Sequence, residues 1–321
     1  MRQYAIASTT NSSIDCLQSE HMAKIYVVDQ NVMRRVELVD LMAAQPDAKF
    51  VIPDTGLLEM AKSDQWEETF RRSFEAFVPV VTRCFMSMSV QEARELEFRT
   101  RVSVEGRLLP VEFTKLLRGA IVESQSGHGP TMSQLRGRMA EVREDLQRNE
   151  LNAQANREEL QRLVGELHSK LTRDEIKACR QEGMAGRLAR LGIARSAGDA
   201  LYVVHMTKSK VPDPVSRRLW KTRSMTRRWC YVLVHHALQW LGDGGLDTAT
   251  DKVVVNDVLD QDYVLLGSLF DGVLSLETDV RNASDDLYVM LSLPPSVNAP
   301  VRAARPSVAA RRVPERSDVD E

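Results

Sequence analysis

Acidic residues that follow short apolar runs are the residues of this chain best suited to chemistry. Residues 25–28, IYVV, form a continuous and partly β-branched run that stops at Asp29. Such a run is typical of a strand buried on both faces. We therefore expect Asp29 at the carboxyl edge of a parallel sheet, where α/β proteins bind ligands. The alternative is that Asp29 only caps the helix that follows.

Glu59 is the second candidate. Residues 49–53, KFVIP, predict another buried strand, and the next helix, with Asp54 or Thr55 as its cap, carries Glu59 among apolar neighbours. A carboxylate in such surroundings costs free energy unless a cation or a metal ion accompanies it. A solvated position at the edge of the helix is the alternative.

More acids lie some two hundred residues further along the chain. Asp257 and Asp260 are three residues apart on a helix that Asn256 can cap, so they share one side of it near its start. That spacing suits joint coordination of a hard cation. Residues 272–275 predict one more buried strand, and it ends near two further acids, Glu277 and Asp279.

These residues resemble the pattern of the PIN-domain family, which are metal-dependent nucleases. The first half of that pattern is an apolar strand that ends in Asp with a nearby Asn, followed about thirty residues later by a Glu on the second helix. The second half is a strand that ends in Thr/Ser-x-acid, with another acid seventeen residues earlier. The matching residues are Asp29, Asn31, Glu59, Asp260 and the motif Ser275-Leu276-Glu277.

Two positions of this match stay open. The last acid of the family is usually Asp, so Asp279 fits by residue type where Glu277 fits by spacing. The third acid could equally be Asp257, Asp260 or Asp262.

The resemblance implies a PIN-like central parallel sheet flanked by helices and formed from both ends of the chain. It also implies cleavage of single-stranded RNA with Mg²⁺ or Mn²⁺, where Asp29, Glu59, Asp260 and Glu277 are catalytic and bind the metal, with Asp257 and Asp279 as further ligands. Asn31 and Ser275 would orient the scissile phosphate or a water molecule. Many members of this family are toxins of toxin–antitoxin pairs, which would make an inhibitor protein a partner, whereas others process ribosomal or messenger RNA, and both roles stay open.

The composition is that of a globular protein. The 321 residues are 43% hydrophobic and 27% charged, and the formal net charge of -2 gives no overall attraction to nucleic acid. The four cysteines are widely spaced, which favours reduced thiols and a cytoplasmic location over disulfides or a zinc site. No apolar run is long enough for a membrane span, so no membrane partner is expected.

The middle of the chain is predicted to be helical. We expect a PIN-like domain in two halves, 22–85 and 251–292, separated by a helical insertion at 86–250. Apolar residues at heptad spacing predict a long helix over about 131–171. It is expected to be continuous, with a hairpin around 149–156 as the alternative. This long helix, here called the helical arm, could form the interface of a homodimer or bind another protein, or it could pack on its own chain. Residues 1–21 and 293–321 are expected to be disordered.

The segment 208–228 is strongly basic and contains Trp220, with Trp229 next to it. Basic side chains pair with phosphates, and aromatic rings stack on unpaired bases, so this segment is the candidate RNA-binding surface. A solvated basic face is the alternative. The candidate residues are Arg217, Arg218, Lys221, Arg223, Arg227 and Arg228.

Two further expectations concern local structure. Residues 78–82, VPVVT, predict the third strand of the sheet. His235 and His236 are adjacent on a predicted helix, so they project about 100° apart and are expected to be structural instead of sharing one site.

Two other functional classes compete with the nuclease. A haloacid-dehalogenase-like phosphatase also starts with an acid after its first strand, but it needs a second acid where this chain has Asn31. A catalytically inactive PIN-like interaction protein would act through its helical arm.

Overall fold

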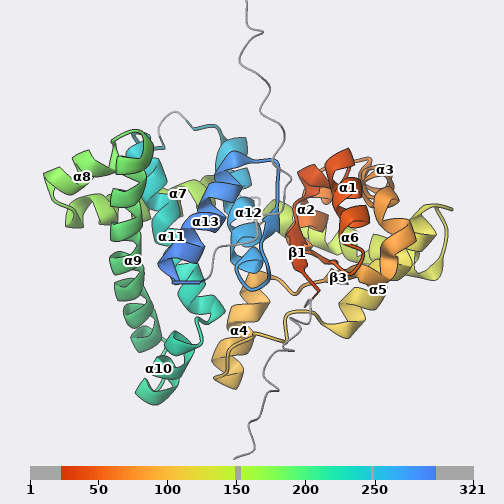
Figure 1. The fold of residues 1–321 in the computed structure, drawn as a ribbon, viewed down its shortest axis with the longest axis horizontal. Coiled ribbons are helices and arrows are strands. Elements are labelled where there is room, and N and C mark those ends of the chain that lie inside the picture. Colours follow the sequence, from red (N-terminus) through yellow and green to blue (C-terminus); the bar gives the residue numbers. More distant parts are fainter. Residues whose placement is uncertain (1–22, 149–152, 247–248, 294–321) are drawn as a thin grey trace, which may run out of the picture.

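A computed structural model describes residues 23–148, 153–246 and 249–293. Within these ranges, thirteen α-helices surround one four-stranded parallel sheet with the strand order β3-β2-β1-β4 (Figure 1). The strands are β1 (Ile25–Val28), β2 (Lys49–Ile52), β3 (Cys84–Met86) and β4 (Val273–Leu274). The predicted mixed α/β class with a parallel sheet is confirmed. The expected disordered ends, 1–21 and 293–321, lie outside the described residues except for Leu293.

The helices follow the strands in a regular order at first and then form a long helical stretch between β3 and β4. The first part contains a short 3-10 helix η1 (Gln30–Val32), α1 (Val36–Ala44), α2 (Asp54–Ala61), α3 (Trp66–Phe74) and the 3-10 segment η2 (Glu75–Arg83). The helical stretch contains α4 (Val90–Thr100), α5 (Val111–Ser124), α6 (Pro130–Arg148), α7 (Ala153–Lys170), α8 (Arg173–Cys179), α9 (Gly183–Lys208), α10 (Asp213–Lys221), α11 (Met225–Gly242) and α12 (Asp251–Gly267). The last helix, α13 (Thr278–Met290), follows β4.

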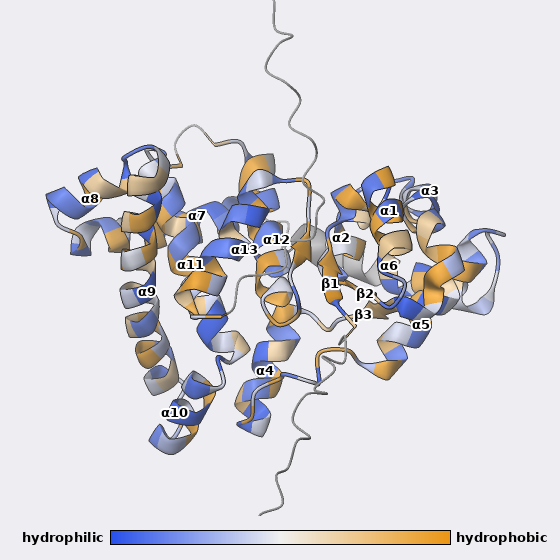
Figure 2. Cartoon of the chain, viewed as in Figure 1, coloured by the Kyte–Doolittle hydropathy of each residue, from blue (hydrophilic) through white to orange (hydrophobic). Residues whose placement is uncertain are grey.

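The sheet separates two hydrophobic cores. Because successive side chains of a strand point to opposite faces, Tyr26 and Val28 of β1 join one core and Val27 joins the other. The first core lies under α1, α2, α3, α5 and α6, whereas the second lies under α4, α7, α9, α11, α12 and α13. The strands are hydrophobic along their length (Figure 2), as expected of a sheet covered on both faces.

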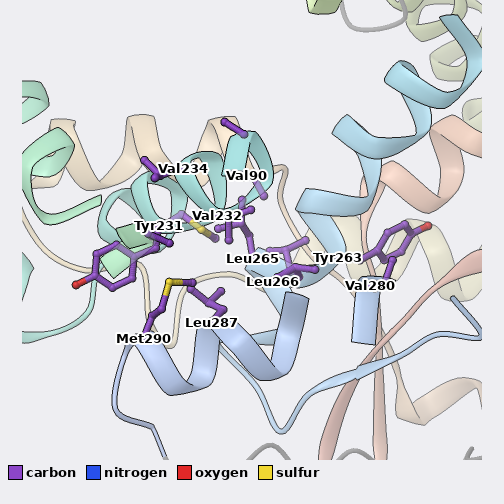
Figure 3. Close-up of a cluster of buried hydrophobic side chains, with 14 of the residues drawn as sticks. Val90, Tyr231, Val232, Val234, Tyr263, Leu265, Leu266, Val280, Leu287 and Met290 are labelled. Atoms are coloured by element: carbon purple, nitrogen blue, oxygen red, sulfur yellow. The ribbon is translucent and has the colours of Figure 1, made fainter. Parts of the chain in front are cut away.

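The second core is formed by side chains from helices that are far apart in sequence. Figure 3 shows Val90 of α4 with residues of α11, α12 and α13 in one cluster. Tyr263 of α12 lies at the edge of this cluster beside Val280, and its hydroxyl points away from the cluster. The C-terminal helices are thereby fixed against one face of the sheet.

The third strand was predicted in the wrong place. Residues 78–82 belong to the 3-10 segment η2, which contains Pro79, and the strand β3 follows it at Cys84–Met86. Phe77 of η2 is fully buried and packs edge-on against Phe50 of β2. This packing holds the β-branched residues after Phe77 outside the sheet.

The heptad pattern over 131–171 corresponds to two helices that pack on different elements. In α6, Leu135 and Met139 are buried in the first core, whereas Leu160 and Leu163 of α7 are buried in the second. The junction at 149–152, which distinguishes a continuous helix from a hairpin, lies outside the described residues. The described seam residues Leu135 and Met139 of α6 and Leu160, Leu163 and Leu167 of α7 are covered by the chain itself, so this part of the seam does not form a free surface for a partner.

A buried carboxylate connects α4 to the start of α11. Glu97 is fully buried, and its oxygens accept hydrogen bonds from the backbone N–H groups of Met225, Thr226 and Val104 at 2.8 to 3.2 Å. The hydroxyl of Thr226 donates a further bond at 3.0 Å. A negative charge at a helix N-terminus is favourable because the first N–H groups have no partner within the helix. Glu97 therefore stabilises the junction between two helices of the second core.

Candidate active site

Asp29 lies at the carboxyl end of β1, as predicted, and its side chain is held from two sides. One oxygen accepts a hydrogen bond from the backbone N–H of Asn31 (3.1 Å), so Asp29 also caps η1. The other accepts a hydrogen bond from the hydroxyl of Ser275 at 2.5 Å, from the end of β4. The two roles considered for Asp29, a cap and a residue of the sheet edge, are compatible. This contact joins the two ends of the chain.

Asn31 connects Asp29 to the acid that follows β4. Its amide oxygen accepts a hydrogen bond from the backbone N–H of Leu276 (3.0 Å), and its amide nitrogen donates to Glu277 at 3.3 Å. The backbone N–H of Glu277 donates to the hydroxyl of Ser275 (3.0 Å). Asn31 and Ser275, which were expected to orient substrate, are bonded within the protein and position the carboxylates of Asp29 and Glu277.

Glu59 is on α2, with its carboxylate directed to α12. It accepts a hydrogen bond of 2.7 Å from the hydroxyl of Tyr263, a side chain that is otherwise fully buried. This contact is the partner that a carboxylate among apolar neighbours requires. Nothing in the sequence indicates this contact, because an apolar face at helical spacing does not show that the hydroxyl of Tyr263 reaches a carboxylate.

α12 places its acids on different sides. The helix begins at Asp251 with Thr250 as its cap, so Asn256 is not the cap, and the acids lie in the middle of the helix. The negative charges of Glu277, Asp29 and Glu59 raise the pKa of Asp260. Asp262 instead accepts a hydrogen bond from the hydroxyl of Thr55 (2.8 Å). Among the three alternatives for the third acid, the geometry favours Asp260.

The carboxylates that converge here hold their protons more tightly than isolated ones. Burial is the main cause in each case, and it raises the pKa of Asp29 to about 6, that of Glu59 to about 7 and that of Asp260 to about 8. The second cause is mutual repulsion. The negative charges of Glu277, Asp29, Glu59 and Asp257 all raise the pKa of Asp260. The charge of Glu277 raises the pKa of all three of these acids, whereas Asp279 is not among the charges that do so. This favours Glu277, the choice that fits by spacing, as the last acid of the pattern.

The chemistry of this group of side chains fits Mg²⁺ or Mn²⁺. Its donors are all oxygens, which both ions prefer, and a divalent charge would relieve the repulsion among the acids. Among the described residues, no three His, Cys, Asp or Glu side chains are already arranged to hold a metal ion together. Mg²⁺ commonly keeps several of its waters and binds through one or two carboxylates. The site therefore fits an ion held partly through water.

The raised pKa values predict a specific dependence of stability on pH. In the unfolded chain these carboxyls have ordinary pKa values of 3.8 to 4.5, so their contribution to stability is complete below about pH 4 and is lost as the pH rises through 6 to 8. In EDTA, Asp260→Asn should therefore melt at a higher temperature than the unmodified protein at pH 8.5 and at about the same temperature at pH 4. Thermal unfolding at both pH values measures this difference.

The matched control is Asp40→Asn, an exposed residue of α1. Its melting temperature should equal that of the unmodified protein at both pH values. Addition of Mn²⁺ at pH 8.5 should raise the melting temperatures of Asp40→Asn and of the unmodified protein, but not that of Asp260→Asn. A higher melting temperature for Asp260→Asn at pH 4 as well would show that the pKa of Asp260 is not responsible.

The basic segment divides into buried and exposed parts. Arg228 is 4% exposed and donates to the backbone oxygen of Ser268 (2.5 Å), and burial lowers its pKa to about 10. Arg227 stacks on Trp220 with its guanidinium 3.6 Å from the ring centre and donates to the hydroxyl of Tyr231. Both guanidinium groups are engaged within the chain at the start of α11, which does not favour the prediction that they bind RNA.

The other basic residues remain on the surface around α10. Arg217, Arg218 and Lys221 are exposed, and Arg223 is half-buried with its guanidinium bonded to the backbone oxygen of Ser292 (3.3 Å). α10 lies away from β1 and α2, at the lower left of Figure 1. The exposed residues can therefore contact only a part of a long substrate that is distant from the carboxylates.

Beside Asp260, a cavity of about 410 Å³ opens between α9, α11, α12 and α13. Its lining includes both His235 and His236, contrary to the expectation that adjacent histidines cannot share a site. His235 bonds to Asp286 of α13 (2.8 Å), and His236 bonds to Gln261 of α12 (2.5 Å). The two rings have partners on different helices, and the cavity borders both of these helices, α12 and α13.

Comparisons of the chain with known protein families, with curated proteins and with solved structures found no match. The resemblance to the PIN-domain family therefore stays a prediction. Within the described ranges, every helix is too short or too polar to cross a lipid bilayer.

Proposed function

We propose that this protein is a Mg²⁺- or Mn²⁺-dependent ribonuclease whose active site is the group of four acids Asp29, Glu59, Asp260 and Glu277. The observation that supports it most strongly is their convergence. Three of them are partly or fully buried and have raised pKa values, although they come from segments more than two hundred residues apart. Crowding negative charges at a sheet edge costs stability, and strongly perturbed carboxyls in one place favour a functional site.

The residues around these acids fix their positions. Ser275 and the backbone of Asn31 hold the carboxylate of Asp29, the side chain of Asn31 holds Glu277, and Tyr263 holds Glu59. The divalent ion, when bound by these acids, would neutralise charge on a phosphodiester and lower the pKa of a bound water. Asp260 lies between this group and the adjoining cavity, where it can bind the ion and face the substrate.

RNA is the proposed substrate because the surface offers exposed cations to a long polyanion. The exposed residues Arg217, Arg218 and Lys221 line a shallow pocket on α10. A cytoplasmic location agrees with this substrate, and the described cysteines Cys84, Cys179 and Cys230 are free thiols.

The role of α10 is tested by the double variant Arg218→Glu with Lys221→Glu. It should weaken binding of a long single-stranded RNA about tenfold and reduce the salt dependence of binding, because two phosphate contacts are lost. Fluorescence anisotropy at several salt concentrations measures both. The same variant should bind a short oligonucleotide normally, and unchanged binding of the long RNA would limit these residues to a solvated surface.

The main experiment is a cleavage assay with the purified full-length chain. A labelled single-stranded RNA should be cut with Mn²⁺ or Mg²⁺ and left intact with EDTA, whereas the same sequence as a duplex should be cut much more slowly. An RNA that stays intact at every Mn²⁺ concentration would contradict the proposal. The alternative, an inactive protein that acts through a helical arm, is less favoured because the described seam residues Leu135 and Met139 of α6 and Leu160, Leu163 and Leu167 of α7 are buried in this chain.

A further inference from the structure

The cavity beside Asp260 is a feature of the described structure that the four acids leave unexplained. It is lined by side chains of α9, α11, α12 and α13, so most of its wall comes from helices outside the sheet. Asp257 and Asp260 of α12 contribute to its lining, which makes the cavity continuous with the carboxylate group. A pocket of a few hundred cubic ångströms is of the size that holds one small organic ligand.

Charged side chains of both signs line this cavity. Arg187 and Arg190 come from α9, and both are half-buried. Asp257 of α12 and Asp279 of α13 form the acidic side, together with Asp243 at the end of α11. Burial raises the pKa of Asp243, the charge of Arg190 lowers it, and the charges of Asp279 and Asp257 raise it, which indicates that Arg190 and the three carboxylates lie near one another.

Buried hydrogen bonds hold the floor of the cavity in place. His235 and Asp286 are each 3% exposed and are bonded to each other, and Asp286 also accepts a hydrogen bond from Arg187 (2.6 Å). Trp240 donates its indole N–H to His236 (2.8 Å) and lines the cavity with its ring. The cavity thus has a fixed polar floor and an aromatic side chain beside it.

The charge of the lining decides which part of an RNA strand can enter. Five aspartates and two arginines line the cavity, so its net charge is negative and a phosphate group would be repelled. A neutral aromatic ring that carries N–H donors would be accepted instead. Single-stranded RNA is commonly recognised in this way, by an unstacked base whose edges form hydrogen bonds.

We propose that this cavity binds a guanine base of the substrate, next to the phosphate that is cut. Guanine has N1–H and N2–H₂ donors on one edge, which match carboxylates such as Asp257 and Asp279. Its O6 and N7 acceptors on the other edge match a guanidinium such as that of Arg187 or Arg190. Uracil has a single N–H donor between two carbonyl acceptors and fits an acidic wall poorly. This inference rests on the proposed ribonuclease function.

The test is a calorimetric titration of the metal-free, full-length protein with guanosine 5′-monophosphate and with uridine 5′-monophosphate in EDTA. The two nucleotides carry the same phosphate, so a difference in affinity reports the base alone. We expect guanosine monophosphate to bind about tenfold more tightly or better. Asp279→Asn and, as a second variant, Asp257→Asn should lose most of this preference, whereas Asp40→Asn should keep it.

Equal affinities for the two nucleotides, or an unchanged preference in both Asp279→Asn and Asp257→Asn, would overturn the inference. Cleavage plays no part in this titration. A protein that cuts RNA without any preference for guanosine monophosphate would retain the ribonuclease function and lose the base pocket. A protein that prefers guanosine monophosphate but never cuts RNA would support the pocket and contradict the ribonuclease.

Discussion

Asp29→Asn is expected to lower the rate of Mn²⁺-dependent RNA cleavage by about 10²-fold or more. Asparagine has nearly the same shape as aspartate. Its amide oxygen can still accept the hydrogen bond of the Asn31 backbone, and its amide nitrogen can donate to the hydroxyl of Ser275. It lacks the negative charge that a divalent ion requires, and the loss of several kcal/mol of charge stabilisation corresponds to a rate effect of this size. Single-turnover cleavage of a labelled RNA measures the rate.

The control for this variant is Asp40→Asn, which removes an exposed acid from α1 and should cut RNA at the rate of the unmodified protein. Circular dichroism should show that both variants are folded. If folded Asp29→Asn retained most of the activity, Asp29 would have no part in the chemistry and the cap of η1 would be its whole role.

Glu97→Ala should have the largest effect on stability. The substitution leaves the N–H groups of Val104, Met225 and Thr226 without their acceptor in a fully buried place, and it opens a cavity between α4 and α11. Unsatisfied buried donors cost about 1–3 kcal/mol each, although the sum is reduced by relaxation and entry of water. We expect a loss of about 3–5 kcal/mol, and a melting temperature lower by roughly 10 °C.

Glu95→Ala is the matched control, because Glu95 lies on the same helix and is exposed. It should change the melting temperature by no more than about 2 °C, as is usual for a surface residue. If the two variants unfolded at the same temperature, the buried carboxylate would not be what stabilises this junction.

Much of the sheet could be predicted because its strands are uniformly apolar. The runs before Asp29 and after residue 48 and the short run after Gly272 correspond to β1, β2 and β4. β3 was misplaced because its sequence, Cys-Phe-Met, contains no β-branched residue, while the preceding VPVVT does. Packing of Phe77 against Phe50 outweighed that local preference.

The site could be predicted only in part because its contacts join distant segments. Spacing indicated Asp29, Glu59, Asp260 and Glu277, but it did not show that Tyr263 donates to Glu59 or that Ser275 donates to Asp29. A basic run likewise does not reveal which arginines are buried. Arg228 satisfies the backbone oxygen that ends α12, a role that only the packing of two helices defines.

The central claim is that the four acids bind one divalent ion, and a calorimetric titration of the metal-free protein with Mn²⁺ at pH 8 tests it most directly. The account predicts one Mn²⁺ per chain, release of protons from Asp260, whose pKa of about 8 leaves it partly protonated at this pH, and loss of this binding in Asp29→Asn. Absence of Mn²⁺ binding, or the same binding in Asp29→Asn, would contradict it.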